Sequence, residues 1–159
     1  MLKIGICGYG TVGQSLISHL EMHNDKIMSN ISEEFVVALI ADRSIDKKDH
    51  RKDIAVTKDV MDIPSSSEID IVIELMGGID IPYKLITASI KNKKHVITAN
   101  KALIAEHGDE LFQLAEKHNV YFGFEASVAG AIPVIQTLTN NMTNEDILSI
   151  TGIIDLSFL

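Results

Sequence analysis

The sequence predicts an α/β fold: a doubly wound, mostly parallel sheet with helices on both faces. Apolar runs of strand length alternate along the chain with segments of helical periodicity, which is typical of right-handed crossovers in a parallel sheet. The run at residues 35–40 is continuously apolar, as expected of a strand covered on both faces. A glycine pattern also follows the first strand and opens the first helix, which favours the Rossmann-type version of this fold.

The elements are expected in the following order. We expect strands at residues 2–7, 35–40, 54–56, 69–75, 95–98, 121–124 and 147–154. We expect helices at residues 11–22, 80–92, 102–119 and 132–140, with residues 24–34 forming a polar connection that prolongs the first helix by a turn. Asp80 is expected to cap its helix, residues 64–67 to form a loop, and the helix at 102–119 to break at Gly108.

The glycine turn predicts a dinucleotide site. It consists of Gly8, Tyr9, Gly10, Thr11, Val12 and Gly13. In this pattern the first glycine permits the tight turn, the second lets the backbone approach a pyrophosphate, and the third allows close packing of helix and strand. The free amides at the helix start favour an anion. The alternative, a ligand-free tight turn, is less compatible with the strand–turn–helix setting.

The second strand ends at Asp42 and Arg43, where the adenosine ribose is expected. An acidic residue there accepts hydrogen bonds from the ribose hydroxyls and favours NAD. A guanidinium could instead pair with a 2′-phosphate, which favours NADP. The sequence leaves NAD and NADP open, and the mixed charges at residues 46–53 read as a solvated loop.

Composition excludes several classes of protein. The 159 residues are one domain's worth of chain, and 46% hydrophobic with 23% charged residues is typical of a globular protein. A net charge of −8 argues against a nucleic-acid partner, and no apolar run is long enough to span a membrane. The single cysteine, Cys7, cannot form an internal disulfide, and no signal peptide is evident, so we expect a cytoplasmic protein.

Ligands of open α/β sheets bind outside the carboxyl ends of the strands. This rule brings four segments together: the glycine turn, Asp42-Arg43, Met76-Gly77-Gly78, and Thr98-Ala99-Asn100-Lys101. Glu125 follows the next strand. We therefore expect a site assembled from residues that are distant in sequence.

Three segments, taken with the glycine turn, resemble the homoserine dehydrogenase family over almost the whole chain. They are residues 71–78 (IVIELMGG), 95–103 (HVITANKAL) and 124–133 (FEASVAGAIP). The resemblance implies interconversion of L-homoserine and L-aspartate 4-semialdehyde with NAD(P)(H), in threonine, methionine and isoleucine biosynthesis. It places Met76, Gly77, Thr98 and Lys101 beside the cofactor, with the Lys101 ammonium near the nicotinamide and the substrate.

The resemblance also implies a monovalent cation site for sodium. Its members here would be Glu125, Val128, Gly130 and Ile132, which offer a carboxylate and backbone carbonyls. Oxygen-only ligation suits a hard cation. The alternative is that Glu125 caps the helix that follows it.

Residues 1–145 are expected to form the NAD(P)-binding domain and residues 146–159 the start of a truncated substrate and dimerisation domain. The family's Asn-Gly-Thr segment does not follow Gly152-Ile153, and its general acid/base lysine cannot be assigned here. We therefore expect a small-molecule substrate and a homodimer only for the full-length enzyme, and no turnover by this chain alone. The alternatives are a non-catalytic NAD(H)-sensing domain, which would not need Lys101, or another small-substrate NAD(P) dehydrogenase.

Overall fold

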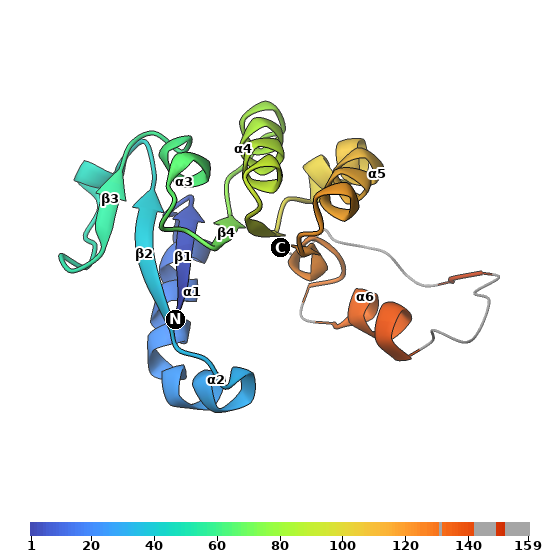
Figure 1. Ribbon diagram of the computed structural model, residues 1–159, viewed down its shortest axis with the longest axis horizontal. Helices are drawn as coiled ribbons and strands as arrows, with labels where there is room; N and C mark the ends of the chain where they lie inside the picture. Colours follow the sequence, from blue (N-terminus) through green and yellow to red (C-terminus); the bar gives the residue numbers. More distant parts are fainter. Residues whose placement is uncertain (131, 142–148, 152–159) are drawn as a thin grey trace.

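The computed structural model describes residues 1–130, 132–141 and 149–151 (Figure 1). Six strands form one sheet in the order β3-β2-β1-β4-β5-β6, and every neighbouring pair is parallel. The strands are β1 Leu2–Cys7, β2 Phe35–Ala41, β3 Ala55–Thr57, β4 Ile71–Glu74, β5 His95–Thr98 and β6 Phe122–Gly123. This is the predicted doubly wound α/β fold, with the expected strands up to residue 124 in place.

The strand order reverses at β1, which lies between β2 and β4. Cys7, the last residue of β1, pairs with Ala41 on one side and Glu74 on the other. The loops that leave these three strands therefore begin at the same level of the sheet. A crevice at such a reversal is where open α/β sheets bind their ligands.

The helices are α1 Thr11–Met22, α2 Asn24–Ile31, α3 Asp62–Ser65, α4 Asp80–Lys91, α5 Lys101–His118 and α6 Val134–Gln136. Short turns of other helical types cover Ile45–Lys47, Glu125–Ser127 and Thr137–Asn141. The helix expected at residues 11–22 is confirmed at both ends, and the polar connection after it is mostly the separate helix α2. The strand expected at 147–154 lies largely outside the described residues, as does the segment 146–159.

Three local predictions were wrong. Residues 64–67 are not all loop, because Pro64 and Ser65 complete the short helix α3, in which Ile63 and Pro64 are buried. Helix α5 does not break at Gly108, because its residues Leu103, Leu111 and Ala115 pack into the core, and this packing outweighs the cost of about 1 kcal/mol for a helical glycine. Asp80 is not the cap of α4: Ile79 holds that position, and Asp80 lies in the first turn.

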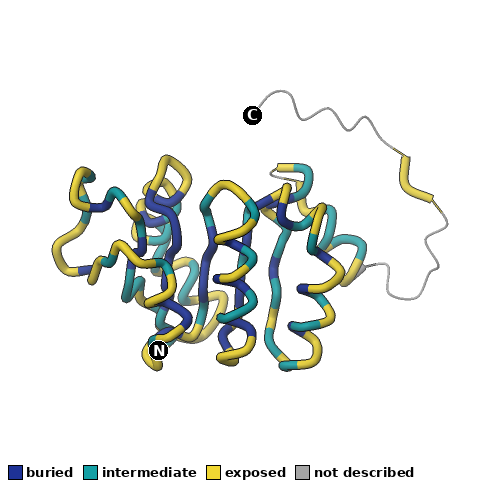
Figure 2. The backbone as a smooth tube through the Cα atoms, turned by 90° about the horizontal axis from the view of Figure 1, so that it is seen from above, coloured by how far each residue is buried: buried dark blue, intermediate teal, exposed yellow. Residues whose placement is uncertain are grey.

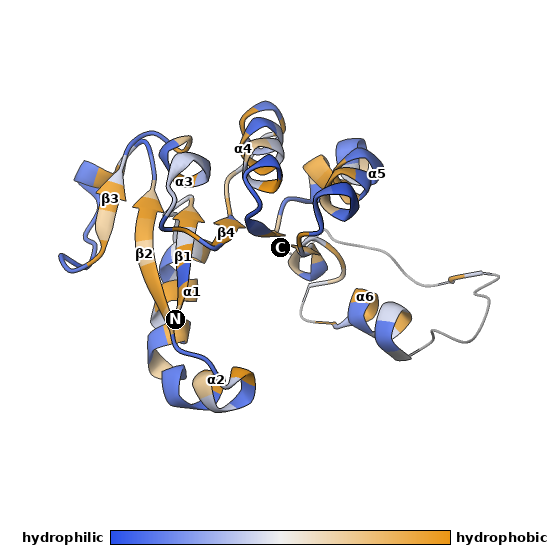
Figure 3. Cartoon of the chain, viewed as in Figure 1, coloured by the Kyte–Doolittle hydropathy of each residue, from blue (hydrophilic) through white to orange (hydrophobic). Residues whose placement is uncertain are grey.

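Two apolar cores lie on opposite faces of the sheet, because consecutive strand residues point to opposite sides. On one face Ile6 and Ile73 pack with Ile17 of α1. On the other, Cys7 and Val72 pack with residues of α3, α4 and α5. Figure 2 shows the buried strands between exposed outer turns, and Figure 3 shows apolar residues concentrated on the strands.

No helix in the described ranges is both long enough and apolar enough for a membrane crossing.

Candidate dinucleotide site

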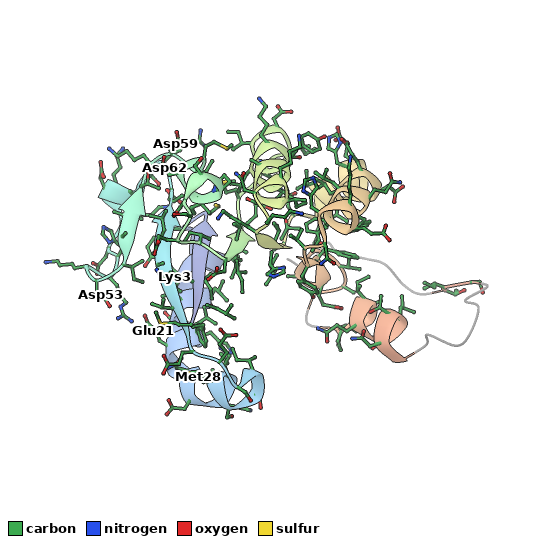
Figure 4. All side chains as sticks on the ribbon, viewed as in Figure 1. Lys3, Glu21, Met28, Asp53, Asp59 and Asp62 are labelled. Carbon is green, nitrogen blue, oxygen red and sulfur yellow. The ribbon has the colours of Figure 1, made fainter. Side chains whose placement is uncertain are left out.

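A cavity of about 850 Å³ opens at the carboxyl ends of β1, β2 and β4. Its lining comes from the glycine turn, the end of β2, the β3–α3 loop, the β4–α4 loop and the start of α4. These residues are Gly8, Gly10, Ala41, Asp42, Arg43, Ser44, Lys58, Asp59, Val60, Met61, Leu75, Met76, Gly77, Ile81 and Lys84. Figure 4 shows Asp59 near the tip of β2, whereas Glu21 and Met28 lie toward the opposite end of the molecule.

The glycine turn has the geometry that requires glycine. Gly8 has φ +100, and a Cβ there would lie 2.8 Å from the Leu75 carbonyl oxygen. A Cβ on Gly13 would collide with the carbonyl of Gly8, so α1 packs directly against the turn. A Cβ on Gly10 would meet nothing within 4 Å, although Gly10 lines the cavity. Gly8 and Gly13 therefore serve the fold, and Gly10 leaves open space for a ligand.

The first turn of α1 offers donors to an anion. Gly10 is the N-cap residue, no side chain caps the helix, and its first turn carries no acidic residue. The backbone amides of this turn have no intrahelical acceptor, and the helix dipole adds positive potential there. Thr11 and Val12 are exposed at this start, whereas the Tyr9 side chain is buried in the core. This arrangement suits a phosphate.

Asp42 is held by four donors from the protein itself. Its Oδ2 accepts the Tyr9 amide at 2.8 Å and the Lys48 ammonium at 2.7 Å. Its Oδ1 accepts the Ser44 amide at 2.8 Å and the Ser44 hydroxyl at 2.7 Å. Burial raises the pKa of Asp42, but the hydrogen bonds from Lys48, Ser44 and Tyr9 outweigh it and hold the pKa well below its usual range. Asp42 is therefore an ionised and fully bonded carboxylate.

The sequence interpretation missed two lysines at this end of the site. Lys48 was grouped with a solvated loop, yet it pairs with Asp42 and is only 23% exposed. Lys58, the residue after the edge strand β3, lines the cavity and pairs with Asp46. The Asp42-x-Ser44 spacing is a signal for a local side-chain turn, but no sequence pattern pointed to Lys58. Exposed Arg43 lines the same end of the cavity, as the sequence suggested.

The ends of β4 and β5 supply the other end of the site. Met76 and Gly77 line the cavity as expected. Thr98 is fully buried and donates its hydroxyl to Glu74 rather than facing the cavity. Lys101 is the first residue of α5 and is exposed, and it does not line the described cavity. The cofactor contacts of Thr98 and Lys101 stay predictions.

Glu125 has the partners of a helix cap. Its two carboxylate oxygens accept the amides of Ile135 and Gln136, each at 2.9 Å, at the start of α6. The Ile132 carbonyl accepts the Val134 amide at 2.8 Å, and the Ile132 residue is 60% exposed. Because these oxygens already accept hydrogen bonds, the arrangement fits helix capping better than a sodium site. Across the described ranges, no three His, Cys, Asp or Glu side chains lie together as metal ligands.

Comparison with known proteins agrees with this geometry. The sequence profile described as "Homoserine dehydrogenase, NAD binding domain" matches residues 8–125. Homoserine dehydrogenase of Pseudomonas aeruginosa is 41% identical over 154 residues, which cover 97% of this chain and 36% of that protein. The Lactococcus lactis homoserine dehydrogenase is 39% identical, with 97% and 37% covered.

Solved structures show the same relationship. The crystal structure of a Thiobacillus denitrificans homoserine dehydrogenase superposes with a TM-score of 0.84 at 37% identity, covering 89% of this chain and 33% of that one. A Staphylococcus aureus homoserine dehydrogenase gives a TM-score of 0.76 at 39% identity, with 84% and 35% covered. The chain thus spans about a third of the length of its curated relatives. It belongs to the homoserine dehydrogenase family and corresponds to the NAD-binding domain of that family.

Proposed function

We propose that this chain binds an NAD(P) dinucleotide as the nucleotide-binding part of an enzyme that interconverts L-homoserine and L-aspartate 4-semialdehyde. The observation that carries the proposal is the cavity at the strand reversal, which Gly10 lines at a point where an added Cβ would meet no atom within 4 Å. The bound dinucleotide supplies the chemistry of hydride exchange. The chain's own residues bind it, orient it and shield one side of it.

The pyrophosphate would lie at the uncapped first turn of α1, where free amides and the helix dipole favour negative charge. The adenosine would extend toward the end of β2, and the nicotinamide toward the ends of β4 and β5. The apolar wall formed by Val60, Met61 and the half-exposed Ile81 would cover the adenine ring. Each of these positions follows from the order of the strands around the reversal.

Lys101 would lie on the substrate side, where its ammonium can donate to a carbonyl or hydroxyl oxygen. In a protein that includes the substrate domain, replacing Lys101 with alanine should lower kcat/KM for homoserine by about a hundredfold or more. An unchanged kcat/KM would remove this role. The purified 159-residue chain should bind the cofactor and show no oxidation of homoserine, and measurable turnover would contradict that expectation.

For the adenosine end we propose a preference for NADP(H). A carboxylate has about four acceptor sites, and the four donors on Asp42 already occupy that number, which leaves little capacity for ribose hydroxyls. The cations Arg43 and Lys58, which line this end of the cavity, suit a 2′-phosphate instead.

Calorimetric titration of the chain with NADP⁺ and with NAD⁺ tests both proposals. We expect NADP⁺ to bind about tenfold more tightly than NAD⁺, and Arg43→Ala to remove that difference by weakening NADP⁺ alone. Lys48→Met should strengthen NAD⁺ binding because it frees one acceptor site on Asp42 Oδ2, which still accepts the Tyr9 amide. Tighter binding of NAD⁺ by the wild type would refute the preference, and no binding of either cofactor at millimolar concentration would refute the dinucleotide site.

A further inference from the structure

Glu74 is the last residue of β4, and its side chain is fully buried. Within the described part of the chain, no other aspartate or glutamate is classed as buried. Burying a carboxylate is costly unless hydrogen bonds satisfy it, and an apolar residue would fill the same space at lower cost. The contacts of Glu74 therefore indicate which structural role accounts for its buried carboxylate.

The carboxylate bridges two strand ends. Its Oε1 accepts the Met76 amide at 2.7 Å, in the loop that leaves β4. Its Oε2 accepts the Thr98 hydroxyl at 2.5 Å, at the end of β5. The backbone carbonyl of Glu74 also accepts the Ala99 amide at 3.2 Å. One residue thus fixes the distance between the β4–α4 loop and the β5–α5 turn.

The bridge continues through Asn100 to the start of α5. The Asn100 amide donates to the Thr98 hydroxyl oxygen at 3.1 Å, and its side-chain nitrogen donates to the Gly78 carbonyl at 2.7 Å. Its Oδ1 accepts the Leu103 amide at 3.1 Å, which caps α5. Lys101 is the next residue in the chain. The position of Lys101 therefore depends on the same network as the loop at residues 76–78.

The direction of these bonds suits an ionised Glu74. Thr98 receives a hydrogen bond from Asn100 and directs its own proton to Glu74, while the Met76 amide donates to the other oxygen. Burial holds the pKa of Glu74 above its ordinary value, although the hydrogen bonds from Thr98, Met76 and Asn100 act in the opposite direction. A protonated carboxyl would need a further acceptor for its own hydrogen. The two donors therefore stabilise the charged form of Glu74, and the charge in turn strengthens their hydrogen bonds.

We propose that Glu74 is a positioning residue for the nicotinamide half of the dinucleotide, acting through the Met76 amide and the Thr98 hydroxyl. It holds residues 76–78 and the first turn of α5 at the separation that the nicotinamide riboside requires. The inference rests on the proposed function, because the glycine turn after β1 places the second half of a dinucleotide over β4 and β5.

The test compares two ligands on the purified chain by calorimetry. NADP⁺ carries both halves of the dinucleotide, and adenosine 2′,5′-bisphosphate carries only the adenosine half. Glu74→Gln places an amide NH₂ opposite one of its two donors, and we expect it to weaken NADP⁺ about tenfold while bisphosphate affinity stays within about twofold. Thr98→Val should do the same, and Thr98→Ser, which keeps the hydroxyl, should retain wild-type affinity for both ligands.

Ser89→Ala is the matched control, because Ser89 is also fully buried and bonded, but to the Leu85 carbonyl inside α4. Ser89→Ala should lower the stability of the fold without weakening NADP⁺ binding more than bisphosphate binding. If Glu74→Gln does not fold, Thr98→Val decides the question. Equal weakening of both ligands, or no weakening of NADP⁺, would overturn the positioning role. A wild type that binds the bisphosphate and NADP⁺ equally would also overturn it, whereas a wild type that binds neither refutes the proposed function itself.

Discussion

Replacing Gly8 with alanine should destabilise the fold strongly, whereas the same change at Gly10 should not. The backbone of Gly8 has φ +100, which costs a residue with a side chain about 1–2 kcal/mol. The added Cβ would also lie 2.8 Å from the Leu75 carbonyl oxygen and 3.1 Å from Met76 Cγ. Overpacking of this kind costs about 1–3 kcal/mol, and a backbone oxygen moves less readily than a side chain.

The two costs sum to about 3.5 kcal/mol at the middle of their ranges. For a chain of this length, each kcal/mol lowers Tm by about 2–4 °C, so Gly8→Ala should unfold roughly 7–14 °C below the wild type. Thermal unfolding followed by circular dichroism measures this shift. Urea denaturation should show a lower midpoint with an unchanged slope, since the exposed surface on unfolding is the same.

Gly10→Ala is the control, since φ is −83 there and a Cβ meets no atom within 4 Å. A poorer N-cap and a less flexible unfolded chain have opposing effects of about 0.5 kcal/mol each, so Tm should stay within about 2 °C. Its binding of NADP⁺ should fall about tenfold or more, because the methyl group enters the space for the pyrophosphate. If Gly8→Ala unfolds within 2 °C of the wild type, or if Gly10→Ala is equally destabilised, the assigned roles are wrong.

Three further predictions concern charged residues outside the glycine turn. The folded pKa of Asp42 is depressed, so its contribution to stability is fully present above the unfolded pKa of about 4 and is lost as pH falls toward the folded value. Asp42→Asn should therefore flatten the acid side of the curve of unfolding free energy against pH, measured by urea denaturation. An unchanged acid side would contradict this. Lys94 is only 5% exposed and donates to two backbone carbonyls near α3. Lys94→Met should therefore lower the free energy of unfolding by about 2–3 kcal/mol, measured by urea denaturation. An unchanged free energy of unfolding would show that water replaces the ammonium. Glu125→Ala should speed hydrogen exchange of the first amides of α6 and cost about 1 kcal/mol with or without sodium; protection that depends on sodium would favour the cation site instead.

Elements specified by short-range patterns were predictable to the residue. The strand at residues 2–7, the helix at 11–22 and the strand at 95–98 have the predicted bounds. In each case the apolar periodicity and the flanking turn residues agree, so local and long-range preferences coincide. Gly108 shows where this fails, because it stays helical within a helix whose buried face packs into the core, and local preference does not include that packing.

The residues of the site also fall into those that the sequence pattern identified and those that it did not. The glycine turn, Asp42, Arg43 and the Met76-Gly77 loop could be read from the sequence, because each follows a recognisable strand and parallel strands bring their carboxyl ends together. Lys58 could not be found in this way, because it lies in the loop after an edge strand of only three residues.

The amino-acid sequence by itself determined the fold class, the order of the first elements, the family and the end of the sheet at which the cavity lies. Only the tertiary structure decided how the charges are used: Asp42 accepts the amide of Tyr9 from the glycine turn, and Glu74 bonds across to Thr98. The reason is physical. Periodicity and turn chemistry act over a few residues, whereas the partner of a buried carboxylate depends on distances between strands and loops that exist only once the sheet has formed.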